Sequence, residues 1–580
     1  MLPRLDRSFP SWRPSVPALP SLLRDLPVIV FGVALFYGLV SLTRYWTGAV
    51  NTQPVIHLNP IALPKYALYS VARLALAYFT SLVITLVYAY LAAHSARAER
   101  ILIPLLDTLQ SIPVLSFLPP VMVSMVTLFP DRQLGVELGS ILLIFTGQVW
   151  NMTFSAYSSF KNVPQELLEA AQVYRLSWWQ KFAQIELPYA VIGLVWNSMM
   201  SVAGGWFFLM ACEMFVLGNR DLRLPGLGSY LQTAANAGDT RAILWGVFTM
   251  IAVIVLIDQL IWRPIIAWSE KFKFEQVEAS QTPSSPVLDL LRQSRILKRA
   301  GRAAVAPALE ALSLYLARRE AVRSRVGPKS AWRDRAVLAL GVLALIGIAY
   351  AVVDMVFMLA RLSGSEFIGI LRGAGATFLR VEFVLALAAL WTVPVGVAVG
   401  LRPRLAAIAQ PIAQIAASVP ATALFPIVLL VLIRIGGGLG LGSIVLLLLG
   451  TQWYILFNVI AGASAIPTDL KEVCTVFRLS RVDRWRKLLL PAIFPYLITG
   501  FVTASGGAWN ASIVAEYFKF HGKTIAITGL GAVISRATDD GNFPALLAAT
   551  IVMASLVVTV NRLLWRRLYT LAATRFSLNA

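Results

Sequence analysis

The chain has 580 residues, of which 58% are hydrophobic and only 14% are charged, and its formal net charge is +21. Soluble proteins carry about a quarter charged residues, so this composition excludes an ordinary soluble enzyme and indicates a polytopic membrane protein. The Lys and Arg residues collect between apolar runs, where cytoplasmic placement and anionic lipid explain them without a nucleic-acid partner.

Six apolar runs in the first half of the chain reach the length of about 20 residues that a bilayer-spanning helix needs. They lie at roughly 26–43, 67–93, 102–128, 138–160, 188–214 and 242–265. Basic residues precede the first run and follow the second, fourth and sixth. Because cytoplasmic loops carry an excess of Lys and Arg, we expect these loops and both ends of this half to lie in the cytoplasm.

The composition changes abruptly at 269–335, a basic segment with no apolar run of membrane length. Leucines at helical spacing predict one or two amphipathic helices there, on the membrane or on a partner, and a simple tether is the alternative. Six further runs follow at roughly 336–360, 376–400, 405–433, 441–463, 491–517 and 543–566. We therefore predict an all-α polytopic membrane protein of about 12 transmembrane helices, with a first half (1–268), a cytoplasmic linker (269–335) and a second half (336–580).

The two halves are copies of one another. Pro104, Pro113 and Pro119 recur 307 residues later as Pro411, Pro420 and Pro426. From residue 139 onward the offset is 303, and it relates Trp150 to Trp453, Glu169 to Glu472, Trp206 to Trp509 and Glu213 to Glu516. Two six-span repeats of the same orientation predict a pseudo-twofold axis along the membrane normal, with a transport pathway at their interface.

The loop after the fourth span has the same pattern in both halves. The first copy runs from Pro164 through Glu169-Ala170-Ala171 to Pro188, and the second runs from Pro467 through Glu472-Val473-Cys474 to Pro491. Pro is tolerated at the start of a helix because its missing N–H has no partner there in any case. Each loop is therefore predicted to form short helices that project into the cytoplasm, where a soluble motor can grip them.

This pattern resembles the loop signature of the permeases of type I ABC importers. Trp206 and Glu213 followed by Gly226-Leu227-Gly228, and the equivalent Trp509, Glu516 and Gly529-Leu530-Gly531, are similar to the nitrate, taurine/sulfonate and bicarbonate branch. The resemblance implies two permease halves fused in tandem, which move a small solute into the cytoplasm by alternating access. A small anion such as nitrate, a sulfonate or bicarbonate is the expected solute.

The resemblance also implies partners and a location. Two ATP-binding subunits, which carry ATP and Mg, are expected on the cytoplasmic face, and an extracytoplasmic solute-binding protein is expected on the other. The chain is expected in the inner (plasma) membrane of a bacterial cell, with both termini cytoplasmic. The segments expected to couple it to the ATPases comprise Glu169, Ala170, Ala171, Arg175 and Leu176, and Glu472, Val473, Cys474, Arg478 and Leu479.

Two departures from the family pattern occur in these segments. Arg175 and Arg478 stand where the motif usually has Gly, and Val473-Cys474 replaces Ala-Ala in the second copy. An Arg in both copies is either an adaptation to a specific partner or a tolerated surface substitution.

Charged and aromatic residues inside the spans are the candidates for the solute pathway, because ionisable groups are costly there. Arg73 and Arg380 lie in the second span of each half, and Glu213 and Glu516 lie in the fifth. They either meet the solute or form a structural Arg–Glu pair in each half. Trp206 and Trp509 are further candidates, as are Trp150 and Trp453, for which packing between helices is the alternative. Pro113 and Pro420 are expected to break the third span of each half.

Other functional classes fit less well. A secondary active transporter with two six-span repeats is the alternative, but it predicts paired acidic residues at mid-span, and it leaves the matched cytoplasmic loops unexplained. The sequence has no phosphate-binding loop, so ATP hydrolysis is assigned to a separate chain. Cys212, Cys474 and three scattered histidines offer neither a disulfide framework nor a metal site, and we expect no catalytic residue and no cofactor in this chain.

Overall fold

The computed structural model describes residues 54–130, 132–217, 220–272, 285–300, 331–520 and 523–575, with scattered positions in 25–48 and 302–318. Most of these residues are helical. The strands among them form two antiparallel hairpins, β1–β2 (Val216–Leu217 with Arg220–Asp221) and β3–β4 (Tyr517–Phe520 with Lys523–Ala526). The predicted span 26–43 and much of the predicted linker lie outside the described residues.

The first half is a series of helices that follows the predicted apolar runs, because apolar helices satisfy their own backbone groups inside a bilayer. They are α2 (Leu63–His94), α3 (Ala96–Ser111), α4 (Leu118–Leu128), α5 (Gln133–Lys161), α6 (Gln165–Val173), α7 (Trp178–Lys181), α8 (Leu187–Glu213), α9 (Leu227–Ala237), α10 (Thr240–Ile257) and α11 (Arg263–Ser269). In the linker, α12 (Pro286–Gln293) and α13 (Arg295–Ala300) are helical, as the leucine spacing predicts.

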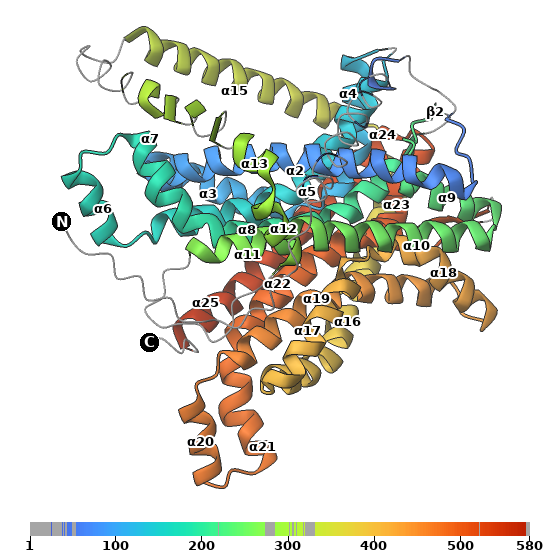
Figure 1. Ribbon diagram of the computed structural model, residues 1–580. Helices are drawn as coiled ribbons and strands as arrows, with labels where there is room; N and C mark the ends of the chain where they lie inside the picture. The colour runs from blue at the N-terminus through green and yellow to red at the C-terminus, as the bar shows by residue number, and fades with distance from the viewer. Residues whose placement is uncertain are drawn as a thin grey trace, which may run out of the picture.

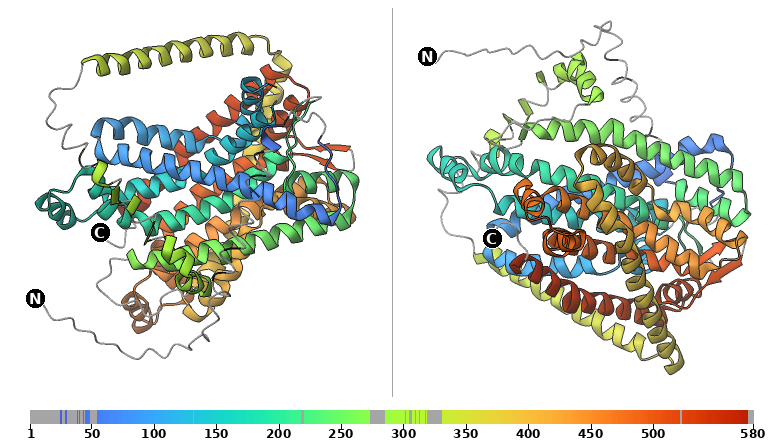
Figure 2. Two further views of the ribbon diagram at one scale, coloured as in Figure 1. Left: turned by 45° about the horizontal axis from the view of Figure 1, so that its top comes forward. Right: turned by 90° about the horizontal axis from the view of Figure 1, so that it is seen from below.

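The second half repeats this order. Its helices are α15 (Ala331–Leu359), α16 (Gly364–Gly400), α17 (Pro403–Ser418), α18 (Ala421–Arg434), α19 (Leu439–Ser464), α20 (Thr468–Val476), α21 (Arg481–Arg484), α22 (Leu490–Ala515), α23 (Leu530–Asp539), α24 (Phe543–Val560) and α25 (Arg566–Arg575). Figure 2 shows α15 along the outside of the helical body in both views, and it contacts α24.

The repeat extends to details of helix geometry. One wide π-helical turn precedes α8 at Phe182–Glu186, and its counterpart precedes α22 at Trp485–Leu489. A second turn follows α10 at Asp258–Trp262, and its counterpart follows α24 at Asn561–Trp565. Both pairs keep the offset of 303 residues. In each half the same three helices pack in a row, α2 on α5 on α8 and α16 on α19 on α22.

Seven helical segments of the described residues are long and apolar enough to cross a membrane, or eight if one bent pair is a single span. They are 60–94, 178–213, 240–272, 364–400, 439–464, 481–515 and 543–572, and the bent pair is 96–110 with 114–128. The all-α polytopic fold is confirmed, whereas the predicted count of about 12 spans is not.

The third span of each half is interrupted as predicted. The segments on either side of Pro113 are bent by 87° relative to each other. In the second half, α17 ends at Ser418 and α18 begins at Ala421, so Pro420 lies in the break. Pro lacks the N–H that would continue the helix and clashes with the preceding turn, which explains why both copies break at the same place.

The short helices form two separate projections from the body. The pair α6–α7 and the pair α20–α21 both extend away from the end of the molecule that carries α9, α23 and the hairpins (Figure 1). This arrangement confirms the predicted helical character of the two loops. It also places the two repeated surfaces at distinct positions on the molecule.

Candidate functional site

A buried charge cluster joins α2, α5 and α8 in the first half. Arg73 Nε and Nη2 donate to the Oε2 and Oε1 atoms of Glu137 at 2.6 and 2.7 Å, and Arg73 Nη1 donates to Glu213 Oε1 at 2.7 Å. Arg73 is 1% exposed, and the two glutamates are 0% exposed. A fork-like guanidinium matches a carboxylate with two parallel hydrogen bonds, and this geometry locks the three helices together.

Glu213 also holds the segment that follows it. The Ser70 hydroxyl donates to Glu213 Oε1 at 2.7 Å, and the Gly228 N–H donates to Oε2 at 2.7 Å. The Pro225 carbonyl accepts a further hydrogen bond from Arg73 Nη1 at 2.9 Å. The carboxylate therefore organises the start of α9, which explains why Glu213 is followed by the Gly226-Leu227-Gly228 pattern.

The second half has a simpler version of the same cluster. Arg380 Nη1 pairs with Glu516, which also accepts from the Thr377 hydroxyl at 2.8 Å and from the Gly531 N–H at 2.8 Å. The position equivalent to Glu137 is Gly440, so Arg380 has one carboxylate where Arg73 has two. Arg380 is 16% exposed, in contrast to the fully enclosed Arg73.

For the charged residues inside the spans, the sequence left two alternatives, contact with the solute or a structural Arg–Glu pair in each half. The structure shows the Arg–Glu pairs. Arg73 with Glu213, and Arg380 with Glu516, are bound to each other between the second and fifth spans of each half. None of the four is among the described residues that line the central cavity, and neither is Trp509. The place of these five residues on the solute pathway therefore stays a prediction. Each Arg has a carboxylate neighbour, as a charge in a low-dielectric interior requires.

Replacing Gly226 or Gly529 by Ala is expected to destabilise its half of the protein by about 3 kcal/mol, the upper range for overpacking a core. A Cβ at Gly226 would lie 2.2 Å from the Glu213 carboxylate, and one at Gly529 would lie 2.1 Å from that of Glu516. Both backbones are extended, so the clash alone causes the effect. The measurement is the thermal midpoint of the purified chain. Gly440→Ala, whose added Cβ meets nothing within 4 Å, is the control and should leave the midpoint unchanged.

Each projection ends in the same unusual turn. Arg175 and Arg478, both with φ of 49°, are the positive-φ non-glycine residues of the described chain. After α6 the Leu176 N–H donates to the Ala171 carbonyl at 3.0 Å, and after α20 the Leu479 N–H donates to the Cys474 carbonyl at 3.0 Å. This six-to-one bond is the Schellman closure, whose left-handed position glycine usually occupies. The geometry explains why Gly stands here in the family motif.

The two helix ends present similar side chains to solvent. Val173 and Tyr174 are 79% and 78% exposed, and Val476 and Phe477 are 77% and 72% exposed. The Arg of each turn is also exposed, as are Glu169 and Glu472. In contrast, Ala171 and Cys474 are buried. The departure from Ala-Ala in the second copy therefore keeps a small residue at the position that faces inward.

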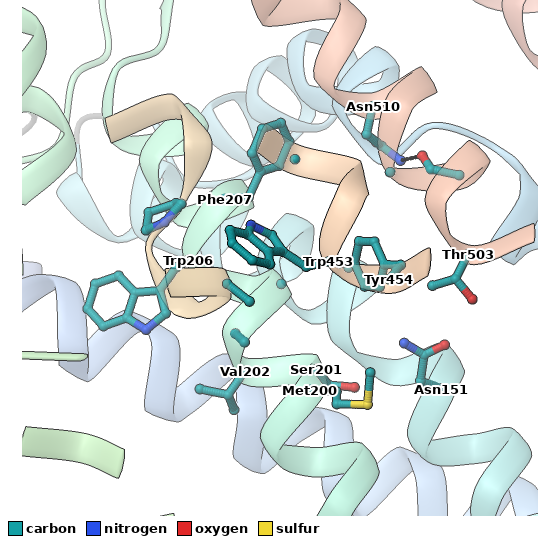
Figure 3. A pocket seen from close by; sticks show the side chains of 18 of the residues that line it. Asn151, Met200, Ser201, Val202, Trp206, Phe207, Trp453, Tyr454, Thr503 and Asn510 are labelled. Atoms are coloured by element: carbon teal, nitrogen blue, oxygen red, sulfur yellow. Dashed lines mark hydrogen bonds between the residues drawn. The ribbon is translucent and has the colours of Figure 1, made fainter. Parts of the chain in front are cut away.

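A cavity of about 650 Å³ lies between the two halves (Figure 3). Trp150 and Trp206 line it from the first half, and Trp453 lines it from the second. These three predicted residues come together there. Sequence reasoning did not select the remaining lining from span five, such as Phe207, Thr503 and Asn510, because nothing in the sequence shows which face of that helix turns inward.

Comparison with known proteins decides the family. The chain matches the binding-protein-dependent transport system inner membrane component over residues 81–261 and again over 392–570. Together the two matches cover more than half of the chain. The protein belongs to this permease family. The duplicated match confirms that two permease units are joined in tandem.

Several named permeases are similar to the chain. The nitrate import permease protein of Leptolyngbya laminosa is 29% identical over 188 residues, which cover 32% of this chain and 64% of the relative. The bicarbonate transport system permease protein of Synechococcus elongatus is 29% identical over 32% of this chain and 64% of its own length. The taurine transport system permease protein of Escherichia coli is 28% identical over 32% of this chain and 61% of its own length. The chain thus matches less than two thirds of each relative.

Membership of this permease family relates the cavity, the ion-pair clusters and the helical projections to one another. A permease of this family is a multi-pass membrane component that is not itself catalytic. Here its two units meet around one cavity, and each unit carries one buried ion-pair cluster and one helical projection.

Proposed function

We propose that this chain supplies both permease halves of an ATP-driven importer, with residues 1–268 and 336–580 as the halves and 269–335 as a cytoplasmic linker. The solute moves by alternating access through the cavity between the halves. The relatives are named for nitrate, bicarbonate and taurine, and similarity to them favours a small anion. That expectation has to be weighed against the chemistry of the cavity itself.

The two matched projections carry this proposal. Each bears an exposed Glu, two exposed apolar residues and an exposed Arg in a strained turn, at positions related by 303 residues. Exposed apolar residues grouped in this way mark protein interaction sites. We assign Glu169 to Leu176 and Glu472 to Leu479 to the coupling helices, each docked on one ATP-binding subunit. ATP and Mg belong to those subunits, and the permease contributes no cofactor.

The opposite end of the molecule is the proposed docking face for an extracytoplasmic solute-binding protein. There the halves touch through α9 and β3, where the Gln232 side-chain amide donates to the Lys519 carbonyl at 3.2 Å. Contact between the halves at this face and separate projections at the other suit a motion driven from the ATPase side. With the projections inside, both termini are cytoplasmic and the permease lies in a bacterial inner membrane.

The test is purification of the permease in mild detergent from its native membrane, with identification of co-purifying proteins and an ATPase assay. An ATP-binding protein in the complex, together with ATP hydrolysis, supports the importer. If the permease purifies alone and drives uptake into vesicles that contain no ATP, the importer proposal is wrong.

One observation favours a secondary transporter as the second candidate. Glu382 lies at the centre of α16, partly buried, and its Oε1 is enclosed without a hydrogen-bond partner among the described residues. Carboxylates in such positions relay protons in some carriers. The position equivalent to Glu382 in the first half is Ala75, so the paired acidic residues that this class predicts are not present here.

Replacing Arg175 and Arg478 by Gly is expected to stabilise the isolated permease while weakening its hold on the ATPases. A left-handed residue costs about 1–2 kcal/mol unless it is Gly, so each substitution should relieve a cost of that order. The measurements are the thermal midpoint of the permease and the amount of ATPase that it retains. If ATPase binding is unchanged, the two Arg side chains are tolerated surface residues and not partner contacts.

A further inference from the structure

The cavity between the halves is almost free of charge. Of its described lining residues, Asp258 is the only Asp, Glu, Lys, Arg or His. Asp258 starts the π-helical turn beyond α10, where it accepts from Arg263 Nε at 3.3 Å. No cationic side chain among the described residues faces the cavity, and Arg73 and Arg380 are held by their own carboxylates.

The walls of the cavity are rich in aromatic rings. Six Trp residues line it, with Tyr454 and three Phe residues. They are Trp150, Trp196, Trp206, Trp262, Trp453 and Trp565, with Phe207, Phe208 and Phe457. The face of an aromatic ring carries partial negative charge, so it attracts cations and stacks on flat molecules but repels an anion. The donors that these walls offer to an oxyanion are neutral, among them Trp150 Nε1 and Trp565 Nε1, which have no hydrogen-bond partner among the described residues. Leaving water without a charged partner is costly for an anion.

The polar groups of the cavity are mainly uncharged amides and hydroxyls. Asn151, Thr503, Tyr454 and Asn510 all line the cavity (Figure 3). The Asn510 Nδ2 group donates to the Gly506 carbonyl at 3.0 Å, and the Asn510 Oδ1 atom accepts from the Leu115 N–H at 3.3 Å. Each of these groups retains hydrogen-bonding capacity because an amide has two N–H donors and a two-lone-pair acceptor.

The amides and rings alternate across the interface. Asn151 in the first half is equivalent to Tyr454 in the second, and Phe207 in the first is equivalent to Asn510 in the second. Each half therefore contributes one amide and one ring at these two positions. A molecule between them can stack against aromatic faces while its edge bonds to the two amides. The cavity volume of about 650 Å³ is in the range of sites for organic ligands. It is far larger than the volume of a triatomic or tetratomic anion.

We propose that the cavity binds an uncharged, planar solute, namely a nitrogen heterocycle or an aromatic amide, by stacking on Trp453 and Tyr454 and by hydrogen bonds to Asn151 and Asn510. The solute class rests on the importer function proposed above, since the cavity lies between the two transport halves. It departs from the small anion that similarity to the named relatives favours.

The experiment is direct binding to the full chain in lipid nanodiscs, without ATPase. The probes are radiolabelled cytosine, an uncharged planar heterocycle, and radiolabelled taurine. Saturable binding of cytosine is expected, weakened about tenfold by Trp453→Ala, since stacking on an aromatic ring is worth about 1–3 kcal/mol. Combining Asn151→Leu with Trp453→Ala should weaken cytosine binding further. Trp245→Ala is the matched control, because Trp245 is 51% exposed on α10 and does not line the cavity.

Two results would overturn this proposal. The first is saturable binding of taurine that Trp453→Ala abolishes, which would make the cavity an anion site. The second is no saturable binding of cytosine to a chain that still co-purifies with its ATPase. In both cases the importer function stands while the solute class fails. Conversely, cytosine binding by a chain that does not co-purify with an ATPase from its native membrane would support the cavity and count against the importer.

Discussion

Reversing both charges with Glu169→Arg and Glu472→Arg is expected to abolish ATPase association and ATP-driven uptake together. Both glutamates are exposed, Glu169 on α6 and Glu472 on α20, and neither has an ion-pair partner among the described residues. An exposed carboxylate without a partner in its own chain is available to a cationic group of a docked subunit. Loss of one charge pair buried at an interface costs about 2–5 kcal/mol, so each reversal should lower the affinity for its own ATPase by a factor of about 30 or more.

The measurement is the amount of ATPase retained on the purified permease, with ATP-driven uptake into vesicles alongside. Asp540→Arg is a matched control for ATPase retention only, because Asp540 is an exposed acid at the end of α23, on the far side of the molecule from the projections (Figure 1). The single variants should each lose part of the binding, since the projections are separate. Full ATPase retention by the double variant would show that these helices are not the coupling surface.

The second large effect is expected from Arg73→Met. The substitution leaves Glu137 and Glu213 buried without their cation, and an unpaired buried charge costs about 3–5 kcal/mol. The expected result is a sharp fall in the thermal midpoint and in the yield of folded permease. Arg380→Met should have a smaller effect, because Arg380 is 16% exposed and faces one carboxylate instead of two.

A compensated variant separates stability from transport. Adding Glu137→Gln and Glu213→Gln to Arg73→Met removes the charges together and should recover part of the midpoint, because the remaining groups are neutral. If Arg73→Met keeps the midpoint of the wild type but loses solute binding, then Arg73 contacts the solute and the structural role assigned here is wrong.

Most of the correct predictions came from the internal sequence repeat. The offset of 303 residues located the equivalent loops, and Pro113 and Pro420 located the breaks, because proline acts on its own helix wherever it stands. The ion pairs of Arg73 and Arg380 were foreseen as one of two alternatives. Comparison with the family motif located the Arg residues that stand in place of Gly, and the left-handed backbone at these two positions explains why the motif has Gly there.

Other parts of the site could not be predicted. Glu137 was missed because the predicted span began at 138 and because its equivalent, Gly440, gives no repeat signal. Which residues line the cavity depends on how each helix is rotated about its axis. The sequences of α8 and α22 are almost wholly apolar, so they show no polar face that would indicate this rotation. The count of about 12 spans stays unconfirmed, because most of the predicted span 26–43 lies outside the described residues and because length and hydropathy do not fix how bent or short helices cross a bilayer.

The alternation of Asn151 with Tyr454, and of Phe207 with Asn510, has a consequence for how the protein evolved. A permease built from two identical chains must present every wall residue twice, so its cavity is symmetric and a mutation on one side is copied to the other. A tandem gene removes that constraint, and each wall can change alone. The cavity can therefore grip a molecule that itself lacks twofold symmetry in one orientation, a discrimination that is closed to a homodimer.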